Sequence, residues 1–139
     1  MPYPQVLPTA AMNANLAALI AATTGPLNGA KLRVYVNAVS LTPAIVLADF
    51  TEATFTGYAA VAVTWGTILN ATDGTVFVPG GGIEFACTTA GTTQTAYGVY
   101  LTNSAGSTLL AAWSLEVPVG ITNPGDGFVW PLSFGYSGQ

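Results

Sequence analysis

The chain has 139 residues and is poor in charge: two residues are basic, six are acidic, and the net charge at pH 7 is −4. Charged residues make up 6% of the sequence, against roughly a quarter in ordinary soluble domains. Two basic side chains cannot neutralise a phosphate backbone, so the composition excludes nucleic acid as a partner. Because free monomers stay soluble through exposed charge, so neutral a surface favours a protein whose faces are covered by neighbouring subunits.

Hydrophobic residues make up 51% of the sequence, which is enough for the core of one domain, or of a domain with an arm. No apolar run approaches the ~20 residues that span a bilayer, so no membrane contact is expected. The first residues lack the basic start of a secretory signal. We therefore expect a protein that is made in the cytoplasm without an export signal.

Residues 1–29 differ from the rest of the chain and are predicted to form an N-terminal arm. Three prolines among the first eight residues fix φ and remove hydrogen-bond donors, so this stretch should be extended. Asn13 is expected to cap a short helix through Leu16 and Ile20, which Thr23–Pro26 ends. The arm is either a frayed tail or a segment that docks on a neighbouring subunit, and both interpretations stay open. Its candidate contact residues are Tyr3, Pro4 and Leu16.

Residues 30–139 show the two-residue period of β-strands and are predicted to form one β-sandwich domain. In the first strand Leu32, Val34 and Val36 face inward. The outward positions of this strand supply three candidate contact residues, Lys31, Arg33 and Tyr35. The further strands are expected at Ala59–Thr67, Thr67–Asn70, Thr75–Val78, Gly82–Thr88, Gln94–Thr102, Ser107–Glu116 and Gly127–Tyr136. Short strands at nearly regular spacing predict an all-β fold, an antiparallel β-sandwich of the jelly-roll or immunoglobulin-like kind.

Turn residues divide these strands. Asp73-Gly74 predicts a hairpin turn, and Asn103–Gly106 predicts a second turn. The run Gly80–Gly82 is expected to break the chain between two strands, and Pro118–Pro124 is expected to form a loop. Pro131 places the last strand at a sheet edge or at a bulge.

No residue set in the sequence predicts catalysis or a cofactor. The chain has no histidine, which removes the commonest general base and metal ligand at neutral pH. Asp49 and Glu52 have the spacing of a reciprocal helix cap, and we prefer this interpretation to a catalytic carboxylate pair. Asp73 with Asn70 and Thr72 offers too few oxygen ligands for a hard cation. We therefore predict a non-enzymatic protein without cofactor or metal.

Four further side chains have both a core and a functional interpretation. Trp65, Trp113 and Trp130 lie at inward positions of the alternating pattern, so core packing is favoured over a sugar-stacking platform. Cys87 follows the inward positions Ile83 and Phe85 and is predicted to be a small buried hydrophobe. A lone cysteine excludes a disulfide within the chain.

Most of the chain, about residues 31–136, resembles small structural proteins of tailed bacteriophages. Leu32–Asn37 and Leu47–Ala59 are similar to their L-x-L-Y-x-N strand and the acidic D-x-T-E-A-x-x-x-G-Y segment that follows it. Ala96–Thr102 and Thr108–Trp113 resemble their V-Y-G-Y-Y-V and L-L-x-A-E strands. The chain departs from the pattern at Ala112-Trp113, where a charged residue is expected.

The resemblance implies a virion component, placed either on the capsid as decoration or on the tail or its fibres. A capsid decoration or cement subunit fits the composition best, because specific interfaces are depleted of charge at their centres. Its expected partners are capsid or other virion subunits and further copies of itself, and its expected location is the virion. Tyr58 follows a glycine turn and is a candidate aromatic anchor. The alternatives are a glycan-binding module of a tail tip or fibre, and a self-assembling extracellular filament subunit.

Overall fold

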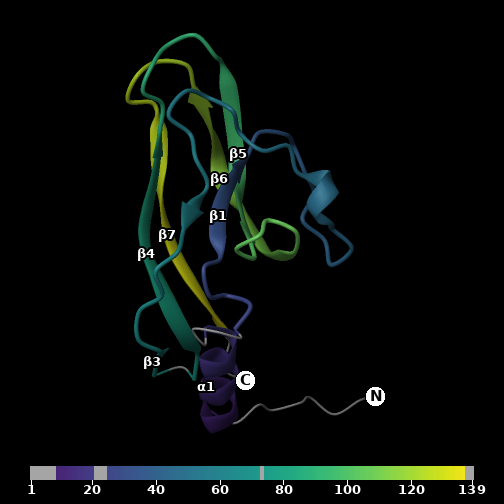
Figure 1. Cartoon of the computed structure of the whole chain (residues 1–139), viewed down its shortest axis with the longest axis vertical. Coiled ribbons are helices and arrows are strands. Elements are labelled where there is room, and N and C mark those ends of the chain that lie inside the picture. Colours follow the sequence, from purple (N-terminus) through teal and green to yellow (C-terminus); the bar gives the residue numbers. More distant parts are fainter. Residues whose placement is uncertain (1–8, 21–24, 73, 137–139) are drawn as a thin grey trace.

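The structure, a computed structural model, describes residues 9–20, 25–72 and 74–136. Two antiparallel sheets face each other, and one helix lies at the base of the molecule (Figure 1). The four-stranded sheet has the order β2-β1-β5-β6, and the three-stranded sheet has the order β3-β4-β7. The strands are β1 Lys31–Tyr35, β2 Val61–Ala62, β3 Leu69–Asn70, β4 Val76–Ala86, β5 Gln94–Thr102, β6 Leu109–Ile121 and β7 Gly127–Tyr136. The predicted β-sandwich is therefore confirmed.

The core lies between the two sheets and follows the predicted alternation. Leu32 and Val34 of β1 are fully buried, and they join Leu101 of β5 and Phe85 of β4 in one cluster. Burying each such side chain contributes about 1.5–3 kcal/mol, so this cluster is the main source of stability. Cys87 is 3% exposed and belongs to the same cluster, which confirms its predicted burial.

The glycine run does not break the chain, and this prediction was wrong. Val76–Ala86 is one strand that pairs with β7 along its whole length, with an irregular register between Pro79 and Gly81. The register passes from Pro79↔Ser133 to Gly81↔Leu132, so Gly80 is the extra residue of a β-bulge, and Gly81 beside it has a φ of 79°, which favours glycine. Because of the bulge, the strand continues through the glycine run, where it was expected to end.

The proline loop after the sixth strand was also predicted wrongly at its start. β6 runs through Pro118 and ends only at Ile121. The register changes from Gly98↔Ser114 to Ala96↔Val119, so four residues of β6 stand opposite a single residue of β5. Such a wide bulge accommodates a proline because no ladder hydrogen bond is required there.

The strand expected at Ala59–Thr67 is much shorter, with only Val61–Ala62 paired to β1 as β2. The reason is that the chain crosses here from one sheet to the other. Val63 N donates to Ala30 O at the end of the four-stranded sheet, whereas Gly66 N donates to Pro79 O in the three-stranded sheet. A crossing segment cannot stay in register with either sheet.

The predicted turns and the edge proline are confirmed. Residues 103–106 form the turn between β5 and β6. β3 and β4 pair as a hairpin in which Gly74 N donates to Ala71 O, while Asp73 lies outside the described residues. β7 is an edge strand, as Pro131 requires. Cys87 N donates to Asp126 O at one end of the ladder. Alternate residues of an antiparallel strand direct their backbone N–H and C=O groups toward the neighbouring strand, and the residues between them direct these groups away from it. Asp126 is directed toward β4, so Pro131, five residues later, is directed toward the free edge, where its missing N–H breaks no hydrogen bond.

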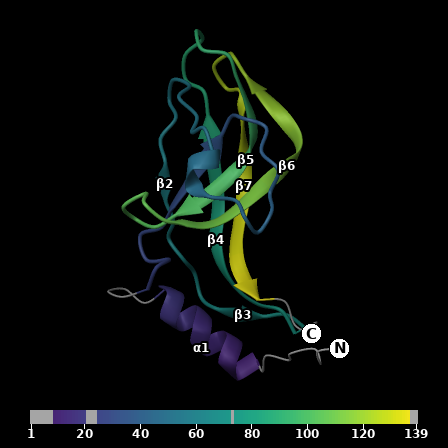
Figure 2. The same cartoon turned by 90° about the vertical axis from the view of Figure 1, so that its right-hand side faces the viewer.

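The helix α1 spans Thr9–Ile20, so a helix in the arm is confirmed, but it begins before Asn13, which is therefore not its cap. Its C-terminal end is fastened to the sandwich at the base (Figure 2). Leu19 and Ile20 pack against Val76 and Val78 of β4, and Leu27 N donates to Leu19 O. The domain boundary after residue 29 stays a prediction. No helix within the described ranges is long and apolar enough to cross a membrane.

Candidate interaction surface

The outer side of β1 carries the ion pair of the described residues. Arg33 Nη1 lies 3.0 Å and 2.9 Å from the two carboxylate oxygens of Glu52, and Arg33 Nε donates to Thr102 Oγ1 at 3.2 Å. The side chains of Arg33 and Glu52 are 18% and 34% exposed. Glu52 stands opposite Tyr35 in an isolated β-bridge, so the backbone itself sets the carboxylate beside β1. The ion pair therefore fastens the segment around residue 52 to the sheet.

Tyr58 fills a gap in the ladder beside β1. Ala53 N donates to Val34 O, while β2 begins only at the partner of Leu32, so the chain leaves the sheet between these points. The buried Val34 N donates instead to the Tyr58 hydroxyl at 3.2 Å, and that hydroxyl donates to Glu52 Oε2 at 2.6 Å. Tyr58 is thus the bridge that satisfies a backbone donor left without a strand partner.

An aromatic cluster of Tyr35, Phe50 and Tyr100 lies next to this network. Phe50 ends the segment of residues 36–50, which runs out from the four-stranded sheet (Figure 1). Phe50 stacks on Tyr100 with ring centroids 4.7 Å apart, and Tyr35 lies against Phe50 at 4.9 Å. The Tyr35 hydroxyl donates to Trp113 O at 3.1 Å. Tyr35 is 1% exposed, so its ring serves the interior of the isolated chain.

Burial sets the ionisation of these tyrosines. Loss of water raises the pKa of Tyr58, and the hydrogen bond to Glu52 raises it further because ionisation would place two negative charges together. Burial and the Glu52 charge raise the pKa of Tyr100 to about 12. Burial also raises the pKa of Tyr35. These hydroxyls are therefore neutral donors and acceptors at physiological pH.

The predicted cap at Asp49 and Glu52 was wrong. Asp49 ends a short 3-10 helix, Leu47–Asp49, and its carboxylate accepts from Val46 N at 2.9 Å. Glu52 does not complete a cap, because it binds Arg33 and Tyr58. The D-x-x-E spacing could not reveal this, since the partner of Glu52 lies 19 positions earlier in the chain.

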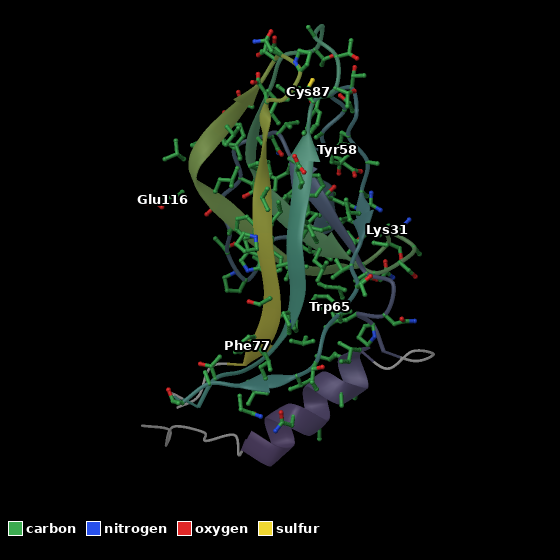
Figure 3. All side chains as sticks on the ribbon, turned by 90° about the vertical axis from the view of Figure 1, so that its left-hand side faces the viewer. Lys31, Tyr58, Trp65, Phe77, Cys87 and Glu116 are labelled. Atoms are coloured by element: carbon green, nitrogen blue, oxygen red, sulfur yellow. The ribbon has the colours of Figure 1, made fainter. Side chains whose placement is uncertain are left out.

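The opposite side of the sandwich presents the outer surface of the three-stranded sheet, which we call the open face. Figure 3 looks onto it, with β4 and β7 in front of the rest of the chain. Its outward positions on β3, β4 and β7 are Leu69, Phe77, Pro79, Gly82, Glu84, Val129, Pro131, Ser133 and Gly135. Glu84 is the only charged residue among them. Val129 is 60% exposed and Leu69 is 46% exposed, so the face combines apolar projections with small side chains.

The bulge of β6 gives a second exposed feature. Val117 is 71% exposed, the highest value among the exposed large hydrophobic side chains of the described residues. It stands between Glu116 and Pro118, both exposed, in the stretch that faces only one residue of β5. Figure 3 shows Glu116 projecting beyond the sheets. Isolated exposed apolar residues are normal, so this bulge alone defines no site.

The predicted contact residues fall in different places. Arg33 and Tyr58 come together at Glu52, Tyr35 lies in the adjacent aromatic cluster, and Lys31 is half-buried on the same strand as Arg33. Tyr3 and Pro4 lie outside the described residues, and Leu16 lies in α1, where its side chain is not described. Whether a partner touches any of these residues stays a prediction.

The tryptophans belong to the core, as predicted. Trp65, Trp113 and Trp130 are partly buried against it, and the rings of Trp113 and Trp130 lie 6.0 Å apart. Trp65 Nε1 donates to Leu27 O at 2.7 Å. The open face itself was missed, although one signal was present: the outward positions of the last strand are Val129, Pro131, Ser133 and Gly135, without a charge.

The part of the chain that the structure describes contains no group of three or more His, Cys, Asp or Glu side chains arranged to hold a metal ion. No protein-family model matches this chain, and neither a curated protein nor a solved structure matches it.

Proposed function

We propose that this protein is a structural subunit of a bacteriophage particle, and that it decorates the capsid and stabilises the shell through protein–protein contacts. The observation that carries the proposal is the open face, a sheet surface with one charged residue and no covering segment among the described residues. An isolated solute gains little from such a face, whereas the centre of a specific interface is depleted of charge. The resemblance of about residues 31–136 to tailed-phage structural proteins supports the same function.

The internal network supports a passive role for the polar residues of β1. Arg33 and Glu52 neutralise each other, and Tyr58 satisfies both the carboxylate and a backbone donor. These groups rigidify the loop beside β1 and are already saturated by one another. A rigid, preformed surface loses little conformational entropy when it binds, which suits a subunit that holds its neighbours in place.

The two alternative functions receive less support. A glycan platform needs exposed aromatic rings, and Trp65, Trp113 and Trp130 are packed against the core. A filament built by strand addition needs free edges that can donate hydrogen bonds. The two long edge strands, β6 and β7, instead contain Pro118 and Pro131, which interrupt such pairing, and the other two edge strands, β2 and β3, are only two residues long.

The proposal is tested with particles assembled without this protein. Purified protein is added to them, and the mixture is centrifuged through a sucrose cushion. We expect the protein to sediment with the particles at a fixed number of copies, and to raise the temperature at which the particles release DNA. Protein that stays in the supernatant and leaves the release temperature unchanged would contradict the proposal.

A further inference from the structure

We propose that the open face binds a second copy of this chain, so that two β3–β4–β7 sheets pack back to back. The twofold axis would lie in the interface and run across the strands, which brings each strand over its own counterpart in the opposite direction. This inference rests on the proposed function, because it names one partner of the same surface. Aligned packing of two sheets is a common way to bury such faces.

Gly82 gives the first argument, because nothing inside the chain requires a glycine there. Its φ is not in the left-handed region, and an added Cβ would make only an ordinary contact, 3.4 Å from Val129 Cγ1. Gly80 is different, since its Cβ would lie 2.7 Å from Leu132 Cδ2. A glycine weakens a strand, and one without an internal reason often marks close approach of another backbone. Gly82 lies near the middle of β4, where two copies would come closest.

Val129 gives the second argument, through the shape of the face. It projects from one half of β7, while the other half presents only Ser133 and Gly135 at its outward positions. The proposed axis passes near the middle of β7 and places Val129 of one copy over Ser133 and Gly135 of the other. Both Val129 side chains then meet a low part of the other copy, and both copies use the same patch, as in an isologous interface.

The distribution of charge permits this pairing. Glu84 is the only charged residue of the open face and lies three positions from Gly81, near the centre of β4. At about 3.3 Å per residue, the two Glu84 carboxylates of a pair would stand ~20 Å apart on opposite sides of the axis. At that separation the repulsion between two single charges is small at the effective dielectric of a protein surface.

The size of the face sets the strength of the pairing. Strands of this length, with the short β3 beside them, give a face about 35 Å long and about 12 Å wide. Each copy would therefore bury roughly 400 Å², which is at the low end for specific contacts. We expect a weak, reversible dimer with a dissociation constant in about the micromolar range, strengthened where copies are concentrated on a particle.

Sedimentation equilibrium of the full chain over a hundredfold range of concentration tests the inference. We expect the wild-type mass to rise toward that of a dimer. Val129→Asp places a carboxylate at an exposed position of the face and should weaken association at least about tenfold, since pairing would bury that charge unpaired against Ser133 and Gly135 of the second copy. Gly82→Val should weaken association similarly, by keeping the two sheets apart. Gly120→Ala is the matched control, because its Cβ meets nothing within 4 Å and it lies on the other sheet.

Circular dichroism melting of each variant separates a lost contact from a lost fold. Association that is unchanged in folded Val129→Asp and Gly82→Val, or a wild-type chain that remains monomeric throughout, would overturn the inference. A monomeric chain that still sediments with particles, and loses this property in both variants, would assign the open face to a different protein. A chain that dimerises through this face but never binds particles would instead refute only the proposed function.

Discussion

Replacing Tyr58 by phenylalanine removes one hydroxyl and keeps the ring in its packing against Phe55 and Phe85. The variant leaves the buried Val34 N without its acceptor at 3.2 Å and takes a 2.6 Å hydrogen bond from Glu52. A hydrogen bond to a charged group contributes about 1.5–3 kcal/mol, and an unsatisfied buried donor costs about 1–3 kcal/mol. Because Glu52 is partly exposed and water can replace one contact, we expect a loss of about 2–3 kcal/mol in the free energy of unfolding.

Urea denaturation followed by tryptophan fluorescence measures this loss. With a slope of about 2 kcal/mol per molar urea, the midpoint of Tyr58→Phe should fall by about 1 M or more. Tyr97→Phe is the control, since the Tyr97 hydroxyl makes no hydrogen bond to any described residue, and the midpoint of this variant should stay close to that of the wild type. Equal midpoints for the two variants would refute the role of the Tyr58 hydroxyl as a bridge across the gap beside β1.

Three further predictions concern ionisation and packing. The raised pKa values of Tyr58 and Tyr100 give stability that is complete below pH ~10, where unfolded tyrosine ionises. This stability is lost as the pH rises through about 12 for Tyr100, so the urea midpoint should fall as the pH is raised above ~10. A urea midpoint that stays level over this pH range would contradict the prediction. Asp126 accepts two backbone N–H groups that lower the pKa of its carboxyl, so Asp126→Ala should reduce the protection of these two amides against hydrogen exchange at a fixed pH and leave the protection of β1 amides unchanged. Gly80→Ala should lower the free energy of unfolding by about 1–3 kcal/mol because the added methyl group crowds Leu132. An unchanged urea midpoint would show instead that the core rearranges to accept the methyl group.

The sequence predicted well those parts of the fold where one face of a strand is buried and the other is not. β7 has the predicted bounds, because its inward positions are all large and apolar, and β5 likewise matches its predicted range. In such strands a shift of one residue would expose the whole apolar set, so the pattern fixes the register. The edge position of Pro131 was predicted correctly for a different reason: proline has no backbone N–H and therefore fits few positions in a sheet.

The strand ends were predicted wrongly where a bulge contains a residue type, glycine or proline, that normally ends a strand. Gly80 and Pro118 lie within long strands because the ladder skips them locally, and no local pattern distinguishes such a bulge from a turn. The candidate site had the same limit. Arg33 and Glu52 were noticed separately, but their contact depends on how residues 51–53 run beside β1. The open face depends on which strands share a sheet. The alternation of apolar and polar residues shows which side of a strand is buried, but it does not show which strands are neighbours.

A density map of the native particle, at a resolution that traces side chains, tests the central claim most directly. The account predicts repeated copies of this sandwich on the particle surface, with the open face around Gly82 and Val129 covered by protein. A particle without these copies, or copies whose open face borders only solvent, would contradict it.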